Sequence, residues 1–317
     1  MEEPVWIGVD VGGTKVLAGV VDAQGRVVRS ATHRTPGRRV EPRQVEDALA
    51  AAVRDVADGQ RVGGVGVAAA GFVDTAAERV MFAPHLPWQG EDLRAGLEHR
   101  FGAPTALDND ANCAALAEWT YGAARGAASA LVVTLGTGIG GALLLDGHVL
   151  RGANGMAGEF GHMQVVPEGH PCECGRRGCW EQYCSGNALV RFARSRMTER
   201  PSVLEEQCGG HHDALTGQMV TDAAAAGDLV AWEAFQSVGD WLGVGVANLV
   251  AAFDPALVVI GGGVSAAGER LLDPARTALA RAVVGVGHRR LPGLVPALLG
   301  PAAGVVGGAA LARRRFG

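Results

Sequence analysis

Residues 5–22, VWIGVDVGGTKVLAGVVD, decide the fold of this chain. Residues 5–10 form a short apolar run, residues 11–14 contain two adjacent glycines, and residues 15–22 form a second apolar run. Two such runs joined by a glycine turn predict a β-hairpin. Another turn leads into a third run at residues 26–33, so the chain is expected to begin with three antiparallel strands.

The same pattern returns in the second half of the chain. Residues 130–135 form an apolar run, a glycine turn begins at Gly136, and the next run ends at Asp146. When Asp22 is aligned with Asp146, Gly12 falls on Gly136 and the second hairpin turns also coincide. Two copies of one pattern indicate an ancient duplication. One copy in each half predicts two related α/β domains that face a cleft.

The remaining pattern supplies further strands and helices around the two copies. We place a smaller α/β domain at residues 1–110, joined by the C-terminal helix 304–317, and a larger one at residues 111–303. Expected strands lie at residues 62–70, 104–107 and 257–260. Expected helices lie at residues 45–57, 91–101, 112–121, 187–197, 229–253, 272–284 and 304–315.

Composition excludes several classes of protein. Glycine accounts for 48 of 317 residues without a three-residue period, which excludes collagen. A net charge of −5 and a pI near 6.0 argue against a general surface for nucleic acid or anionic lipid. Two uncharged stretches, residues 126–145 and 291–312, are long enough to imitate membrane helices, but their glycines favour strands and turns. Since residues 1–10 lack the apolar core of a secretory signal, we expect a cytoplasmic protein.

The first glycine turn is a candidate phosphate site. Gly12 and Gly13 would let backbone N–H groups approach phosphate oxygens, while Thr14 offers a hydroxyl and Lys15 a cation. Asp10 could hold Mg²⁺ directly or through water. The alternative is a plain hairpin turn with an incidental acid. The spacing of a Walker A loop is absent.

Two further glycine turns are candidate nucleotide contacts. Residues 136–141 match the G-x-G-x-x-G dinucleotide pattern, but that fingerprint must open a helix, and here a strand and hairpin follow. A second phosphate hairpin is therefore favoured. Gly262 and Gly263 follow an apolar strand, so their exposed backbone would suit a base or ribose. The alternative at these two glycines is an ordinary β–α loop.

A polar cluster follows the strand expected at residues 104–107. Residues 107–112 read LDNDAN, and one of these side chains is enough to cap the next helix. A spare carboxylate could take the proton from a substrate hydroxyl. Phosphoryl transfer needs positioning, a metal and such a base rather than covalent chemistry. Asp110 is our candidate base, and Asn109 a candidate hydrogen-bond donor to the substrate.

Four soft metal ligands lie close together in the sequence. His162 is followed by Cys172, Cys174 and Cys179, and a Cys₃His set is a common structural zinc site. A disulfide would need an oxidising compartment, and the spacing does not match a usual iron–sulfur run. The other three cysteines, Cys113, Cys184 and Cys208, are interpreted as structural or free thiols.

Two glutamates flank these ligands in the sequence. Glu159 lies three residues before His162, and Glu181 lies two residues after Cys179. A bound zinc ion would hold both carboxylates near one polar pocket, where they could bind vicinal hydroxyls of a sugar. The zinc would then be structural. The alternative is two solvated loop glutamates.

Together these motifs resemble the ROK family of sugar kinases, repressors and uncharacterised open reading frames. The resemblance covers residues 7–312, and within the family the chain is most similar to the ATP-dependent glucokinases of actinobacteria. It rests on residues 10–15, 107–112, 135–141 and 151–155, and is strongest in residues 158–162 (GEFGH) and 172–185, with the pattern C-x-C-G-x-x-G-C-W-E-Q-Y.

The resemblance implies the actin-like ATPase fold, with two ribonuclease H-like domains, and transfer of the ATP γ-phosphoryl group to the 6-hydroxyl of glucose. It implies Asp110 as the base, ATP, Mg²⁺ and structural zinc as cofactors, and a homodimer or homotetramer without nucleic-acid or membrane partners. ATP would contact Asp10, Gly12, Gly13, Thr14, Lys15, Gly136, Thr137, Gly138, Gly262 and Gly263. Glucose would contact Gly71, Asn109, Asp110, Glu159, His162 and Glu181.

One departure from the family pattern concerns the loop at residues 83–88. His85 stands where similar glucokinases usually carry asparagine, so sugar specificity could differ if this loop touches the sugar. The alternatives are a kinase for another hexose or amino sugar, such as N-acetylmannosamine, N-acetylglucosamine or fructose, and a non-catalytic sugar sensor. A repressor is disfavoured, because a DNA-binding domain is expected ahead of the motif that begins at Asp10. Polyphosphate in place of ATP is not distinguished.

Overall fold

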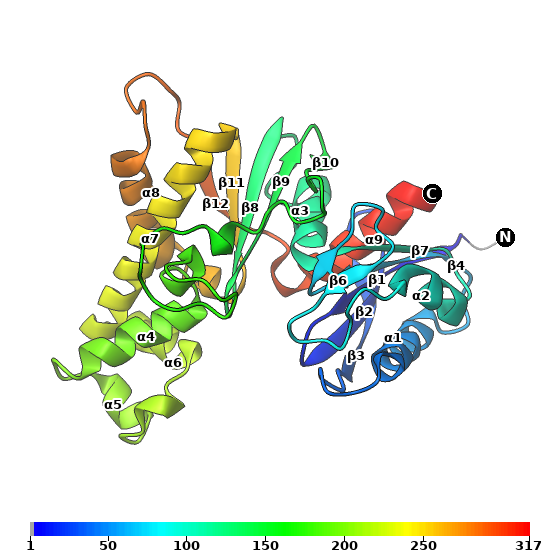
Figure 1. The fold of residues 1–317 in the computed structure, drawn as a ribbon, viewed down its shortest axis with the longest axis horizontal. Helices are drawn as coiled ribbons and strands as arrows, with labels where there is room; N and C mark the ends of the chain where they lie inside the picture. Colours follow the sequence, from blue (N-terminus) through cyan, green and yellow to red (C-terminus); the bar gives the residue numbers. More distant parts are fainter. Residues whose placement is uncertain (1–2) are drawn as a thin grey trace. The chain divides into compact units, whose positions relative to one another are not determined.

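The computed structural model describes residues 3–317, and its first five-stranded sheet has the order β3-β2-β1-β4-β7 (Figure 1). Strands β1, β2 and β3 are consecutive antiparallel neighbours, as predicted, while β4 pairs in parallel with β1 and β7. The strands are β1 (Val5–Val11), β2 (Lys15–Val21), β3 (Val27–Arg34), β4 (Val62–Ala69) and β7 (Thr105–Asn109).

The second five-stranded sheet repeats this topology in the order β10-β9-β8-β11-β12. Matching β8 to β1 matches each neighbour in turn, including the antiparallel β9–β10 pair and the parallel β11–β12 pair. The predicted duplication is therefore confirmed at the level of strand order. The strands are β8 (Ser129–Leu135), β9 (Ile139–Leu145), β10 (His148–Val149), β11 (Leu257–Gly261) and β12 (Gly293–Pro296).

Every expected strand and helix is present, with ends that differ by a few residues. The helices are α1 (Pro42–Ala57), α2 (Leu93–Phe101), α3 (Asp110–Tyr121), α4 (Gly186–Met197), α5 (Val203–Gln207), α6 (Gly217–Ala225), α7 (Leu229–Phe253), α8 (Glu269–Ala282) and α9 (Ala303–Phe316). Helices α5 and α6, strand β12 and the small sheet of β5 (Phe72–Val73) with β6 (Val80–Phe82) were not predicted. Such short segments carry too few residues to display a period.

The chain packs as two compact units. The first contains residues up to 132 together with residues 142–158 and 297–317, and the second contains residues 133–141 and 159–296. Helix α9 thus packs with the N-terminal sheet, and α3 belongs to the same unit because it lies against α9. The domain boundary at residue 110 stays a prediction, since packing divides the chain at other positions.

Helix α9 approaches its sheet so closely that backbone meets backbone. A Cβ atom on Gly8 would lie 1.7 Å from the carbonyl oxygen of Val305, and one on Gly66 would lie 1.7 Å from that of Gly308. Only glycine permits this approach. Part of the glycine excess therefore serves helix–sheet packing rather than ligand binding.

The two uncharged stretches do not form membrane helices. Residues 126–145 contain β8 and β9, and residues 291–312 contain β12 and much of α9. Among residues 3–317, every helix is too short or too polar to cross a bilayer.

Candidate active site

The turn between β1 and β2 is held by its own backbone and by one threonine. The amide of Gly12 donates to the carbonyl of Lys15 at 3.1 Å. The Thr35 hydroxyl donates to the carbonyl of Gly12 at 2.7 Å, and the Thr35 amide donates to the carbonyl of Thr14 at 3.1 Å. Thr14 and Lys15 are exposed, so a well-fixed turn presents a hydroxyl and a cation to solvent.

His85 lies directly beside this turn. A Cβ atom on Gly13 would be 2.7 Å from the Cβ of His85, which leaves room only for glycine. The loop that departs from the family pattern therefore packs on the predicted phosphate turn, and the His85 side chain is exposed there.

Two carboxyl groups of the first unit, Asp10 and Asp110, have raised pKa values. Burial, followed by the charge of Asp110, raises the pKa of Asp10 to about 6, and Lys15 opposes the shift. Burial also raises the pKa of Asp110, against the hydrogen bond from the amide of Ala111. A pair of hard oxygen donors with a high affinity for positive charge fits Mg²⁺ chemically.

The turn from β7 into α3 separates the capping residue from the candidate base. Asn109 is the N-cap, and its Oδ1 accepts from the amides of Ala111 at 2.9 Å and Asn112 at 3.1 Å. Asp110 begins the helix and is only partly exposed. Asp110 Oδ1 shares the Ala111 amide at 2.9 Å, but since Asn109 already accepts from both amides, the Asp110 carboxylate is not required for capping.

Gly71 is joined to this turn. Its carbonyl accepts a hydrogen bond from Asn109 Nδ2 at 3.0 Å. A Cβ atom on Gly71 would lie 2.8 Å from the carbonyl oxygen of Phe82 at the end of β6. The structure thus brings together Gly71 and Asn109, two of the predicted sugar-binding residues.

The four predicted zinc ligands meet in the second unit. Their ligand atoms all lie within 4.8 Å of one another. The Sγ atoms of Cys174 and Cys179 are 3.6 Å apart, and Cys172 Sγ is 3.7 Å from His162 Nδ1. Tetrahedral zinc with bonds of about 2.0–2.3 Å separates its ligand atoms by roughly 3.5–3.8 Å. The residues therefore fit a Cys₃His zinc ion.

Both flanking glutamates lie next to this cluster. Glu181 Oε1 accepts from Cys172 Sγ at 3.0 Å and is 3.7 Å from His162 Nδ1. Glu159 Oε2 lies 3.9 Å from the other ring nitrogen, His162 Nε2. The two carboxylates therefore lie near different ring nitrogens of one histidine, and their shared role in a sugar pocket stays a prediction.

The turn between β8 and β9 meets two other glycine-rich segments. The amide of Gly136 donates to Gly138 at 3.0 Å, and the amide of Gly186 donates to Gly136 at 2.8 Å. Gly262 has a φ of +83°, and a Cβ atom there would lie 2.4 Å from the carbonyl oxygen of Leu135. Glu181 also reaches this turn, because its Oε2 accepts from the Ile139 amide at 3.5 Å.

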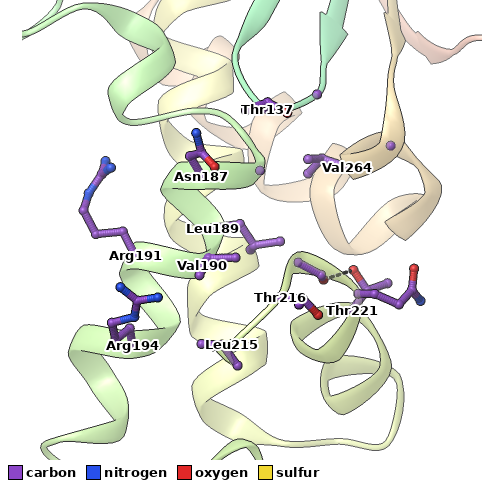
Figure 2. A pocket seen from close by; sticks show the side chains of 15 residues that line it. Thr137, Asn187, Leu189, Val190, Arg191, Arg194, Leu215, Thr216, Thr221 and Val264 are labelled. Atoms are coloured by element: carbon purple, nitrogen blue, oxygen red, sulfur yellow. Dashed lines mark hydrogen bonds between the residues drawn. The ribbon is translucent and has the colours of Figure 1, made fainter. Parts of the chain in front are cut away.

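A pocket of about 750 Å³ opens beside these glycines, large enough for a small organic ligand. Figure 2 shows Thr137, Asn187 and Val264 at one end and Thr216 and Thr221 at the other. The lining also includes Gly136, Gly263, two arginines of α4 and no acidic side chain. The contributions of α4 and α6 were not predicted, because only an Arg/Thr/Gln composition without a motif marks them in the sequence.

The comparisons with known proteins agree over nearly the whole chain. A model of the ROK family matches residues 6–315. The chain is 42% identical to a glucokinase of Streptomyces coelicolor over 97% of each chain. It is 43% identical to a ROK family glucokinase from Streptomyces griseus solved with glucose and AMPPNP, at a TM-score of 0.89 over 98% of this chain and 99% of that one. A ROK hexokinase from Thermus thermophilus is 35% identical over 98% of each, at a TM-score of 0.77.

These matches, together with the duplicated sheets, confirm the fold expected from the resemblance, an actin-like ATPase fold with two ribonuclease H-like halves. The chain belongs to the ROK family.

Proposed function

We propose that this chain is an ATP-dependent glucokinase that phosphorylates the 6-hydroxyl of glucose. The observation that carries the proposal is the 43% identity, over 98% of the chain, to an enzyme solved with glucose and a non-hydrolysable ATP analogue. The intact Asp10 and Asp110 support an enzyme rather than a sugar sensor.

The nucleotide would bind through the glycine turns. Gly12, Gly13, Thr14 and Lys15 would contact phosphate in the first unit, and the 750 Å³ pocket beside Gly136, Thr137 and Gly263 would hold the nucleoside. The apolar and hydroxyl side chains of that pocket suit a base and a ribose, and its arginines suit an anionic ligand. Gly138 and Gly262 complete the predicted set of contacts.

Asp110 would remove the proton from the sugar hydroxyl as the phosphoryl group arrives. Burial raises the pKa of this carboxyl, which makes Asp110 a stronger base than an exposed aspartate. Asn109 holds the turn through its cap and its bond to Gly71, so the base is presented from a rigid element. In phosphoryl transfer, such positioning supplies most of the catalysis.

The sugar would be held by carboxylates and an imidazole as well as by the Asn109 turn. Glu159, His162 and Glu181 are the candidate ligands of its hydroxyls, and their positions depend on the Cys₃His cluster. A zinc ion there would be structural, because its four ligands are all protein side chains and leave no open position.

Three further features belong to the proposal. Mg²⁺, when bound near Asp10, would neutralise charge on the transferred phosphate. A cytoplasmic location follows from a reaction that consumes ATP. A homodimer or homotetramer is proposed on the family resemblance alone.

A hexose panel with Mg-ATP tests the proposal. Purified protein should phosphorylate glucose with a higher kcat/KM than mannose, fructose, N-acetylglucosamine or N-acetylmannosamine. Polyphosphate in place of ATP forms a second arm. A higher value for another sugar would reassign the substrate, and absence of transfer to every sugar would refute the kinase. The variant Asp110→Asn, purified identically, controls for a contaminating kinase.

A further inference from the structure

Asp108 is a buried carboxylate for which the proposed reaction has no use. It is the penultimate residue of β7, with 3% of its surface exposed, and only Glu118 among residues 3–317 is a comparably buried acid. Burial of a charge is costly unless hydrogen bonds and an opposite charge compensate. Asp108 Oδ1 accepts from the Asn109 amide at 2.8 Å and from Asn112 Nδ2 at 2.9 Å, and Oδ2 accepts from Arg151.

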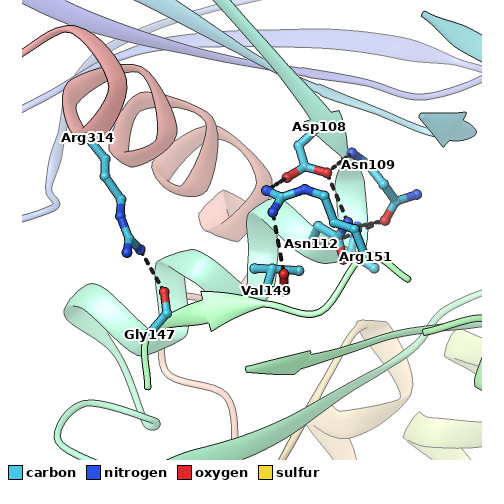
Figure 3. Close-up of polar contacts among 8 residues, drawn as sticks. Asp108, Asn109, Asn112, Gly147, Val149, Arg151 and Arg314 are labelled. Carbon is cyan, nitrogen blue, oxygen red and sulfur yellow. Dashed lines mark hydrogen bonds and ion pairs between the residues drawn. The ribbon is translucent and has the colours of Figure 1, made fainter. Parts of the chain in front are cut away.

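Arg151 comes from the segment that follows β10, 43 residues further along the chain (Figure 3). Its Nη1 donates to the Val149 carbonyl at 3.4 Å, and its own carbonyl accepts from the Ala157 amide at 3.0 Å. Gly155 in the same segment is buried, and a Cβ atom there would lie 2.0 Å from the Val73 carbonyl oxygen. The arginine is therefore mounted on a braced segment.

The partners of Asp108 are the residues that build the turn into α3. Asn109, whose amide donates to Asp108, caps the helix, and Asn112 lies in the first turn of that helix. Asp110 stands between them. Asp108 consequently links Arg151 to both sides of the candidate base.

Several charges of this region act on one buried thiol, that of Cys113. The thiol of Cys113 is buried, and its pKa is raised first by burial and then by Asp108, Asp110 and Asp10, with Arg151 as the opposing charge. Arg151 is thus the positive charge that opposes the three carboxylates around this thiol.

We infer that Arg151 is a positioning residue that, by holding the Asp108 carboxylate, fixes the turn carrying Asn109 and Asp110. The inference rests on the proposed function, in which Asp110 is the base. It assigns a role to the segment at residues 151–155 beyond the family resemblance.

A double-mutant cycle tests the inference. Arg151→Met should lower kcat about 100-fold, because loss of the ion pair lets the base move, while the KM values for glucose and ATP change by less than about threefold. Asp108→Asn should act similarly. Because both changes break the same link, the double variant should have a kcat no lower than the worse single variant. Multiplied losses in the double variant would overturn the inference.

Arg314→Met is the matched control. Arg314 donates to the Gly147 carbonyl at 2.6 Å, in the turn before β10, and its second Nη atom lies 3.4 Å from His148 Nε2, so it contacts this segment away from Asp108 (Figure 3). This variant should keep the wild-type kcat. Arg151→Lys retains the charge without the guanidinium fork, and should recover about tenfold of the activity lost in Arg151→Met.

Amide hydrogen exchange gives a readout that does not depend on activity. In Arg151→Met, the peptide covering residues 108–112 should exchange about tenfold faster than in wild type and Arg314→Met. If wild type phosphorylates no sugar but this exchange responds, the proposed function fails and the positioning role stands. Wild-type exchange and wild-type kcat in Arg151→Met would overturn the inference. If Arg151→Met does not fold, the double variant with Asp108→Asn replaces it, because that variant buries no unpaired charge. A wild-type kcat in the double variant would also overturn the inference.

Discussion

The two copies of the five-stranded sheet share a topology but differ in where they carry charge. In the first copy, β1 contains Asp10 and β7 leads directly into Asp110. In the second, the position equivalent to Asp10 is Thr134, and β12 is followed by Ala297 and other apolar residues. The acid chemistry of the duplicated scaffold is therefore confined to one copy.

In the second copy, the acidic side chain near the turn comes from outside the sheet. Glu181, in the short helix Trp180–Gln182, reaches the β8–β9 turn through the Ile139 amide and the zinc cluster through Cys172. Its turns otherwise consist of exposed glycine backbone beside a pocket. One strand order thus supports two kinds of site: carboxylates at strand ends in the first copy, and backbone with a metal-braced loop in the second.

The largest loss of activity is expected when the candidate base, Asp110, is removed. Asp110→Asn should lower kcat about 1000-fold, since the amide cannot accept the hydroxyl proton, while glucose affinity measured by calorimetry stays near wild type. The cap on α3 comes from Asn109, so folding should be preserved. Wild-type turnover in this variant would show that another residue is the base. The first copy would then not be distinguished by a catalytic carboxylate after β7.

Asp10 offers a test in which activity and stability move in opposite directions. Asp10→Asn should lower kcat about 100-fold through weaker Mg²⁺ binding. Without metal, however, the folded state holds the Asp10 proton with a pKa of about 6, against 3.8 for an ordinary aspartate. The ionised carboxylate therefore destabilises the fold above pH 6, and this penalty disappears as the pH falls through 6 toward 3.8.

Calorimetry in EDTA measures this penalty. At pH 8, Asp10→Asn should be more stable than wild type by about 1–2 kcal/mol, a figure reduced for the partial exposure of the side chain. The difference should shrink at pH 4.5. The exposed Asp222→Asn serves as the control and should show no such pH dependence. A difference that grows as the pH falls would contradict the burial of an ionised Asp10.

The metal-braced loop of the second copy is tested by Cys172→Ser. The variant should lose about one zinc per chain, because three ligands hold the ion more weakly than four. The KM for glucose should rise about 10- to 100-fold, since Glu181 and His162 lose their support. Cys208→Ser, at a buried cysteine outside the cluster, should retain zinc and KM. Loss of zinc without a change in KM would separate the metal from the sugar site.

The sequence predicts those features that local spacing determines. The hairpins and the approach of His162 to the three cysteines follow from residues close together in the chain, and the duplication is visible because each copy is itself a local pattern. The Asp108–Arg151 pair is different, because it joins residues 43 positions apart, and neither residue type identifies its partner. The same holds for the pocket between α4 and α6, whose lining becomes contiguous only after folding.

The glycines also show that contacts between distant segments cannot be predicted from the sequence. The sequence marks a glycine excess, and the turns account for part of it. Gly8 and Gly66 lie in the middle of strands, and only the structure shows that α9 backbone occupies the space of their side chains. A glycine excess therefore indicates that the backbone contacts something closely. It does not indicate whether that neighbour is a ligand or a helix.

The smallest expected effect concerns Lys15, the only lysine of the chain. Ile139 occupies the equivalent position in the second copy, so Lys15→Ile makes the first hairpin match the second. Because Lys15 is exposed and its charge acts through water, the KM for ATP should rise only about three- to fivefold. The KM for glucose should stay constant, and Lys15→Arg should behave like wild type in steady-state kinetics. An equal rise in both KM values would show that the change disturbs the hairpin itself, and that the cation is not what distinguishes the first copy.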